Sequence, residues 1–210
     1  MDLRKPQAAI IPQIVEVKDG KTTTFDPFSG LLKDRIIVVE SEVNTAMASS
    51  VVAQLLLLEK QDPEAEITMY INSPGGSVMD GLAIADTMDF INCDVRTVGM
   101  GMQASMGSFL LASGAPGKRH MLRRSQIMIH RLSSQVKGDY HSMESNFEHV
   151  KALHEMLNEE YARMSGGKKS KEEFVELMRY DNWLTAEQAI EYGIIDSVIS
   201  NKREVNSVNE

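Results

Sequence analysis

The sequence predicts an α/β fold with a largely parallel sheet, and two observations lead to this class. From residue 35 to about residue 130, short apolar runs that suit buried strands alternate with segments long enough for helices. Such alternation is typical of crossover units, whose strands pair in parallel. The 210 residues contain no repeat and no linker long enough to divide them, so we expect one domain.

Composition excludes several classes of protein. The 22 basic and 30 acidic residues leave a net charge of −8 with no basic block, which argues against nucleic acid as the main partner. No apolar run has the length of a membrane span, and residues 1–9 lack the apolar centre of a secretory signal. The single cysteine, Cys93, allows no intramolecular disulfide, so we expect a reducing, cytoplasmic setting.

The N-terminal part predicts a flexible leader over residues 1–10 and a β-hairpin over residues 11–25. Two short alternating runs flank the turn signal Asp19-Gly20. The hairpin has little apolar surface to bury, so it should be mobile. Asp26, followed by a proline, then starts a short helix.

The central part predicts alternating strands and helices. In chain order these are a strand at 35–39, a helix at 44–60, a strand at 66–72, a helix at 77–91, a strand at 94–98, a helix after Ser105, and short strands at 118–122 and 126–129. The helix at 44–60 is apolar on nearly every side, so we expect both of its faces to be covered.

Residues 139–164 predict a long amphipathic helix. Apolar residues recur every three or four positions from Tyr140 to Met164, and most positions between them are charged or polar. Because this helix lies beyond the alternating core, its apolar stripe is expected to face another subunit. Short helices at 171–179 and 185–192, a strand at 194–199 and a disordered tail at 200–210 complete the chain.

Ser105 is the candidate nucleophile because it lies where a strand turns into a helix. The hydroxyl projects from a rigid turn there, and the first amides of the helix can face a negative charge. The small neighbours Gly101, Ala104 and Gly107 allow a second backbone to come close. In the alternative, structural interpretation Ser105 only caps a helix that packs on the sheet, and this stretch by itself favours that alternative.

Acyl-transfer chemistry also needs a base and a group that orients the base. His130 is the candidate base, because it ends an apolar strand. His141, His149 and His154 fall on the long helix and are interpreted as part of its solvated face. Asp181 is the candidate orienting group and is expected to be partly buried. Both His130 and Asp181 also have an ordinary structural interpretation.

Other motifs give weaker signals. Gly75-Gly76 follows a strand and precedes a helix, but the stretch lacks the Lys-Ser/Thr ending of a phosphate loop. Metal ligation is not expected, because the sequence has no His-Glu-x-x-His and no paired cysteines. Gln103 breaks the Gly-x-Ser-x-Gly pattern, and the order Ser, His, Asp is not that of α/β-hydrolases, trypsin or subtilisin.

Together these stretches resemble the family of proteolytic subunits of the ATP-dependent Clp protease (ClpP). The motifs that carry the resemblance are Tyr70-Ile-Asn-Ser-Pro-Gly-Gly76, Ala104-Ser-Met-Gly107, Gly114-Ala-Pro-Gly-Lys-Arg119, Met128-Ile-His130 and Ala186-Glu-Gln-Ala-Ile-Glu-Tyr-Gly-Ile-Ile-Asp196. The resemblance runs from about residue 11 to residue 199. Each motif alone is weak, but their combination and order are specific.

The resemblance implies a fold and an activity. Members of the family have a crotonase-like α/β fold with a protruding handle, which matches residues 131–165 within a single peptidase domain at 11–199. They are serine endopeptidases that cut unfolded polypeptides into short peptides. The resemblance therefore implies that Ser105 is the nucleophile, His130 the base and Asp181 the orienting group.

The resemblance also implies oxyanion donors and partners. The backbone N–H groups of Gly76 and Met106 match the oxyanion donors of the family. Its subunits form seven-membered rings that stack as a tetradecamer, with a hairpin such as residues 11–25 at the axial pore. Tyr70 and Phe90 match aromatic positions that receive loops of a hexameric AAA+ unfoldase. That partner uses the ATP, so no cofactor is expected in this chain.

Three departures from the family pattern lie where its rings touch and where substrate lies. The approach to the nucleophile is Met102-Gln103-Ala104 where the family has Gln-Ala-Ala. Arg131-Leu132 follows His130 where the family has Gln-Pro, and Tyr180 replaces the arginine before the triad aspartate.

Three other functions stay open at this point. A catalytically silent ring subunit is disfavoured by the intact Ser105, His130 and Asp181. An acyl-CoA enzyme of the crotonase type needs a coenzyme site, and no basic cluster supports one. A phage-type capsid-maturation protease lacks the N-terminal hairpin match, although a prophage-borne copy of the Clp family would look the same.

Overall fold

The computed structural model describes residues 12–135 and 137–200. In chain order the elements are β1 (Ile14–Lys18), β2 (Lys21–Phe25), α1 (Pro27–Lys33), β3 (Ile36–Glu40), α2 (Thr45–Gln61), β4 (Ile67–Ser73), α3 (Val78–Phe90), β5 (Val95–Ala104), α4 (Met106–Ala112), β6 (Arg119–Leu122), β7 (Gln126–Ile129), α5 (Tyr140–Met164), α6 (Lys171–Leu177), β8 (Asn182–Leu184), α7 (Ala186–Glu191) and β9 (Ser197–Ile199). The α/β class predicted from the sequence is confirmed. The predicted leader at 1–10 and the tail beyond residue 200 lie outside the described residues.

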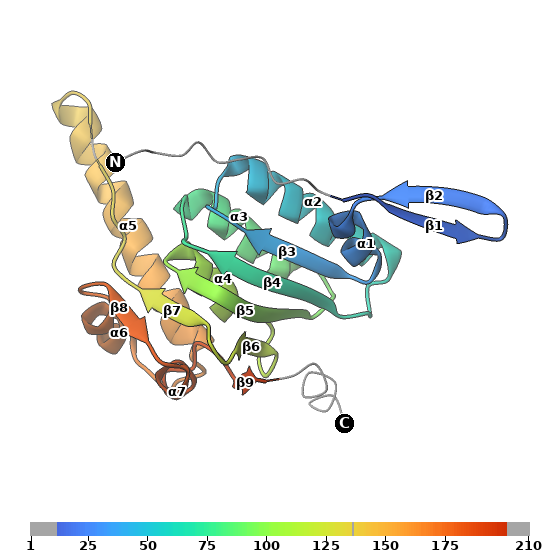
Figure 1. Ribbon diagram of the computed structural model, residues 1–210. Coiled ribbons are helices and arrows are strands. Elements are labelled where there is room, and N and C mark those ends of the chain that lie inside the picture. The colour runs from blue at the N-terminus through green and yellow to red at the C-terminus, as the bar shows by residue number, and fades with distance from the viewer. Residues whose placement is uncertain (1–11, 136, 201–210) are drawn as a thin grey trace, which may run out of the picture.

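Seven strands of the described residues form one sheet around a buried core. Five of them follow the order β3-β4-β5-β6-β9 and pair in parallel, β7 joins β5 in parallel, and β8 joins β7 antiparallel. Helices α2, α3 and α4 lie together on one side of the strands (Figure 1). The core between these layers is fully buried and includes Ile37, Met69, Ile71, Leu110 and Leu111.

Strand β5 is longer than predicted, because it changes partners along its length. Thr97 to Gly99 pair with β6, and Met102 to Ala104 pair with β7. The prediction that the strand ends at residue 98 is therefore wrong. At the change of partner, the Gln103 side-chain amide donates to the carbonyls of Ile71 and Met100, both at 2.8 Å. The second half of β5 leads the chain directly to Ser105.

Two of the expected details of the helix and strand pattern are wrong. Helix α2 is not covered on both faces within the described chain, because Leu56 and Leu57 are 42% and 45% exposed. The last strand covers only Ser197–Ile199, since Ile194 and Ile195 are buried directly after α7 rather than paired in the sheet. No helix of the described residues is both long enough and apolar enough to cross a membrane.

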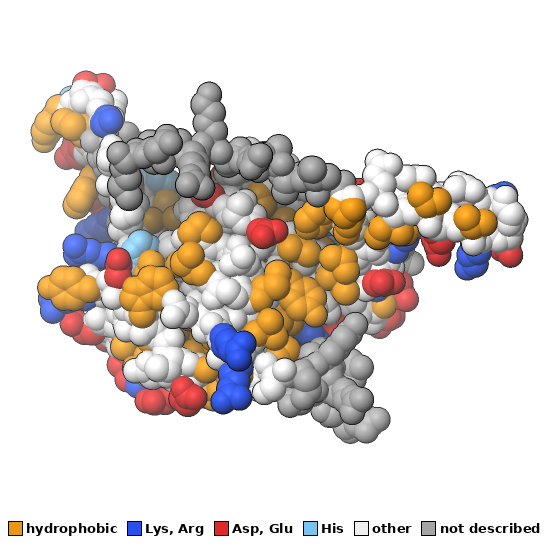
Figure 2. Space-filling view, viewed as in Figure 1, with side chains coloured by type: hydrophobic (Ala, Val, Ile, Leu, Met, Phe, Trp, Pro, Cys, Tyr) orange, Lys and Arg blue, Asp and Glu red, His pale blue; other side chains and the backbone are white. Residues whose placement is uncertain are grey.

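Two parts project from this body, the β1–β2 hairpin and the helix α5 (Figure 1). The hairpin turns at Asp19 and Gly20, both with positive φ as a tight hairpin turn requires, and nearly all its side chains are exposed. The distal half of α5 (residues 140–152) carries exposed apolar side chains at its tip (Figure 2). The proximal half (residues 153–164) packs against α4 and α6.

Candidate active site

Ser105 lies in a strained turn between β5 and α4. Its φ of 54° and ψ of −123° are a conformation that non-glycine residues rarely adopt. The Ser105 amide donates to the carbonyl of Met128 on β7 at 2.9 Å, which ties the turn to the neighbouring strand. The side chain makes no helix-capping bond, so the capping interpretation is wrong for the hydroxyl. Instead, Ser105 Oγ lies 2.9 Å from Nε2 of His130.

His130 is held at the end of β7. The preceding residue, Ile129, pairs with Asn182 of β8, and the following residue, Arg131, donates its amide to the carbonyl of Met178 at 2.7 Å. The backbone is therefore fixed on both sides of the ring. The imidazole itself is 24% exposed, so one edge of it faces the site.

The β7–β8 pairing brings Asp181 to the other side of the ring. Because Ile129 is opposite Asn182 in an antiparallel pair, the residue that follows β7, His130, meets the residue that precedes β8, Asp181. Asp181 Oδ1 lies 3.4 Å from Nδ1 of His130. The expected partial burial of Asp181 is wrong, since its side chain is 69% exposed at the edge of the sheet.

Sequence reasoning missed β8, the strand that sets this register. The sequence signal for this strand was weak, because Asn182–Leu184 has only three residues, too few to show an alternation of apolar and polar side chains. Asn182 is fixed further by its side-chain amide, which donates to the Leu177 carbonyl at 3.0 Å. The turn between α6 and β8 is thus held in place, and with it the position of Asp181.

Two glycines allow a second backbone to pass beside Ser105. A Cβ on Gly75, whose φ is +93°, would lie 2.6 Å from Cβ of Ser105. A Cβ on Gly76, whose φ is +148°, would overlap the Val43 carbonyl oxygen. Among the described residues, no hydrogen-bond acceptor pairs with the amides of Gly76 and Met106. Both residues line the same cavity as Ser105, so two free donors belong to its wall.

A cavity of about 60 Å³ adjoins Ser105 and His130. Its far wall comes from the proximal half of α5 and mixes apolar and polar groups, namely Leu157, His154, Asn158 and Tyr161. The prediction that His154 is solvated is wrong, because the ring is half-buried and its Nε2 lies 3.2 Å from Nδ2 of Asn158.

The residues matched to partner docking lie apart from this cavity. Tyr70 is half-buried on β4 between Val38 and Val98, and Phe90 ends α3 with a side chain that is 79% exposed. No aromatic contact joins these two rings within the described part of the chain.

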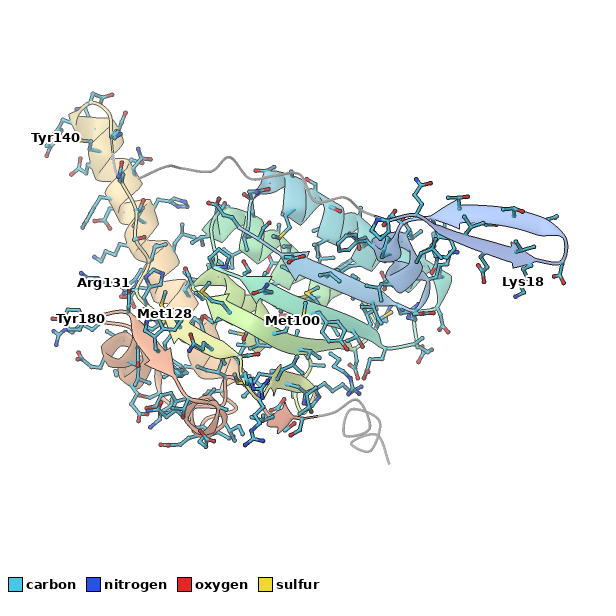
Figure 3. The ribbon with its side chains drawn as sticks, in the orientation of Figure 1. Lys18, Met100, Met128, Arg131, Tyr140 and Tyr180 are labelled. Carbon is cyan, nitrogen blue, oxygen red and sulfur yellow. The ribbon has the colours of Figure 1, made fainter. Side chains whose placement is uncertain are left out.

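The two substituted positions near the triad lie at the surface. Arg131 and Tyr180 point outward beside the base of α5 (Figure 3). Tyr180 is 76% exposed, and Arg131 forms no ion pair with any described residue.

Comparisons with known proteins agree with these observations. The family model described as Clp protease matches residues 19–202. An ATP-dependent Clp protease proteolytic subunit from Ligilactobacillus salivarius (strain UCC118) is 44% identical over 196 residues, which cover 93% of this chain and 98% of that protein. The predicted family and the serine-type peptidase class are confirmed. The chain therefore belongs to the Clp protease family.

Proposed function

We propose that Ser105, His130 and Asp181 hydrolyse peptide bonds as a catalytic triad. The observation that carries this proposal is the 2.9 Å contact between Ser105 Oγ and His130 Nε2 at a strained strand-to-helix turn. A nucleophile and a base within hydrogen-bond distance are the first requirement of acyl transfer. The serine-type peptidase class of the family supplies the reaction.

In the first step, Ser105 Oγ attacks the carbonyl carbon of the scissile peptide and its proton passes to His130 Nε2. To accept this proton at Nε2, the neutral ring must carry its own proton on Nδ1 before the attack. Nδ1 faces Asp181 at 3.4 Å. The Asp181 carboxylate holds this tautomer and stabilises the imidazolium that forms.

The same attack leaves negative charge on the substrate oxygen, and the amides of Gly76 and Met106 are the proposed donors to it. Both are preorganised donors, so no reorganisation is needed as the charge develops. The carbon–nitrogen bond then breaks, and His130 gives its proton to the leaving amine. Water, activated by His130, attacks the ester on Ser105 and releases the carboxylate product, so the chemistry needs no cofactor.

The peptide substrate is proposed to lie as an extended strand beside residues 131–135. This segment is exposed except at Leu132, follows His130 and forms no helix or strand of its own. Its backbone groups, together with the stretch after Gly76, offer strand-like hydrogen bonds. One substrate side chain enters the cavity of about 60 Å³ next to Ser105.

The proposed assembly is two stacked seven-membered rings that enclose the active sites. The exposed apolar side chains on the distal half of α5, together with Leu56 and Leu57 on α2, support contacts between subunits. The relative is named as a subunit of an ATP-dependent protease. A cytoplasmic location, expected from the single cysteine, stays part of this proposal.

A hexameric AAA+ unfoldase is proposed to feed unfolded polypeptides past the β1–β2 hairpin. The exposed Phe90 and the half-buried Tyr70 are its proposed docking positions. The unfoldase would hydrolyse the ATP, since this chain has no phosphate-loop motif. Short peptides should therefore be cut without ATP, and folded proteins only with the unfoldase present. Phe90→Ala should weaken docking more than it slows short-peptide cleavage.

The triad is tested by substitution and peptidase kinetics. Ser105→Ala and His130→Ala should each lower the rate of peptide cleavage by roughly a million-fold. Asp181→Asn should leave the assembly intact but lower the rate of peptide cleavage, because the aspartate orients the base and carries no proton. Ser113→Ala, at the end of α4, is the matched control and should cleave at the wild-type rate. Full activity of Ser105→Ala would refute the proposal.

A further inference from the structure

A buried pair of hydroxyl groups connects the carbonyl of Ser105 to helix α5. Ser108 Oγ donates to the Ser105 carbonyl oxygen at 2.7 Å, and the Tyr161 hydroxyl lies 2.7 Å from Ser108 Oγ. Ser108 is fully buried and Tyr161 is 6% exposed. Neither hydroxyl takes part in the triad, yet the Ser105 carbonyl is one covalent bond from the nucleophile's own Cα.

The direction of both hydrogen bonds follows from counting protons. Ser108 has one hydroxyl proton, which it donates to the Ser105 carbonyl, so Tyr161 must be the donor in the second bond. Burial raises the pKa of Tyr161, so the phenol stays protonated and remains a donor. The bonds therefore run in one direction, from Tyr161 through Ser108 to Ser105.

The Ser105 carbonyl is held by more donors than helix formation requires. The amides of Ser108 and Phe109 donate to it at 3.0 and 3.1 Å, in addition to the Ser108 hydroxyl. This carbonyl shares a planar peptide group with the amide of Met106. Fixing the oxygen therefore fixes the direction of the Met106 N–H, which is one of the two free donors at the cavity.

Aromatic packing fixes the other end of this connection. The Tyr161 ring packs edge-on against Phe109 and lies tilted on Phe174, with centroids 5.5 Å away in each case. Phe174 belongs to α6, which packs on α5. The phenol is thus held by two elements while its hydroxyl reaches α4, and it cannot move without disturbing both.

We propose that Ser108 and Tyr161 are positioning residues that hold the Ser105–Met106 peptide group, and with it the Met106 N–H, in the orientation that stabilises the oxyanion. The inference rests on the proposed function of Ser105 and deepens it. Tyr161 acts only through Ser108, because its hydroxyl bonds to no other described group.

The test measures peptide cleavage and the inhibition constant of a peptide boronate, which mimics the tetrahedral intermediate on Ser105. Active subunits are first counted by fluorophosphonate titration. Ser108→Ala should lower kcat about tenfold and Tyr161→Phe about threefold, less than the loss of a whole oxyanion donor. KM should stay unchanged, and the inhibition constant should rise by the factor by which kcat falls. The double variant should be no slower than Ser108→Ala.

Two matched controls remove the same groups elsewhere. Ser113→Ala deletes a hydroxyl that donates to the Phe109 carbonyl of α4, and Tyr192→Phe deletes the phenol hydroxyl of the residue that follows α7. Both should behave as wild type.

Three results would overturn the inference while Ser105 of the wild-type protein still reacts with fluorophosphonate. These are a wild-type kcat for both variants, losses that multiply in the double variant, and a fall in kcat with no change in boronate inhibition. A wild-type protein that fluorophosphonate does not label would instead refute the proposed function itself.

Discussion

The proximal and distal halves of α5 belong to one continuous helix but lie in opposite surroundings. In the proximal half, Asn158 and Tyr161 are buried, and Tyr161 is bonded to the helix that follows the nucleophile. In the distal half, Tyr140 and Phe147 are 69% and 61% exposed. The proximal half is thus explained by the fold of one chain. The apolar side chains of the distal half are not, and the proposed contact between rings accounts for them.

The sharpest way to test this difference is to remove one large side chain from each half. Tyr161→Ala should lower the free energy of unfolding of the subunit by about 3–5 kcal/mol, because it empties a buried aromatic site. Tyr140→Ala should change that free energy by less than about 0.5 kcal/mol. Urea unfolding of both variants, carried out on separated subunits, checks this. Equal losses would show that the distal half also stabilises the single chain.

A charge on the distal half should affect assembly and leave the stability of the separated subunit unchanged. Phe147→Glu places a carboxylate where the proposed contact buries an aromatic ring, which is worth about 1.5–3 kcal/mol per ring. Native mass spectrometry should show fourteen subunits for the wild type and seven for the variant, with unchanged unfolding of the subunit. A variant that stays a tetradecamer would show that this face is not the contact between rings.

Acid should loosen the end of the proximal half. Arg119 donates to the carbonyl of Met164, the last residue of α5, and is itself held by Asp196 at 2.6 Å. Burial raises the pKa of Asp196, but the bonds from Arg119 outweigh it and leave the pKa below its usual 3.8. A lowered pKa gives stability that is complete above about pH 4 and is lost as the pH falls through the folded value.

Hydrogen exchange at the end of α5 measures this effect. The protection factor there, which divides out the effect of pH on the intrinsic exchange rate, should fall below about pH 4, and Asp196→Asn should lower it already at neutral pH. Asp89→Asn removes an exposed partner of Arg163 on the same helix and is the control, which should exchange as the wild type does. An Asp196→Asn protein with normal exchange would show that the clamp on α5 does not depend on this ion pair.

Of the changes considered, added salt should have the smallest effect. It should shift the assembly of subunits and leave the stability of the single subunit unchanged. Arg131 is exposed and forms no ion pair with any described residue, so a carboxylate of another subunit is its proposed partner. An exposed pair contributes about 0–1 kcal/mol, and salt screens it over about 10 Å. The ratio of fourteen to seven subunits, and peptidase activity with it, should fall along a salt series. A native mass and a peptidase rate that do not change with salt would show that Arg131 does not contribute to the contact between subunits.

The sequence predicts the parts of this molecule that local pattern determines. Alternating strands and helices, the Asp19-Gly20 turn, the helix cap at Asp26, and the long stripe of α5 depend on nearest neighbours along the chain. Each of these was predictable because the physical cause lies within a few residues of its effect.

The parts that sequence reasoning missed depend on contacts between distant residues. The second half of β5 exists because β7 pairs with it, and β8 exists because β7 offers an edge. The exposure of Asp181 follows from that edge position. Ser108 and Tyr161 are 53 residues apart, so no local pattern could pair them.

Fluorophosphonate labelling followed by peptide mapping tests the central claim most directly. The reagent reacts with a serine whose hydroxyl is activated by a neighbouring base, which is the state assigned here to Ser105 beside His130. The account predicts one modified peptide, the one that contains Ser105, and loss of labelling in Ser105→Ala and in His130→Ala. Modification at another serine, or labelling of His130→Ala at the wild-type rate, would contradict it.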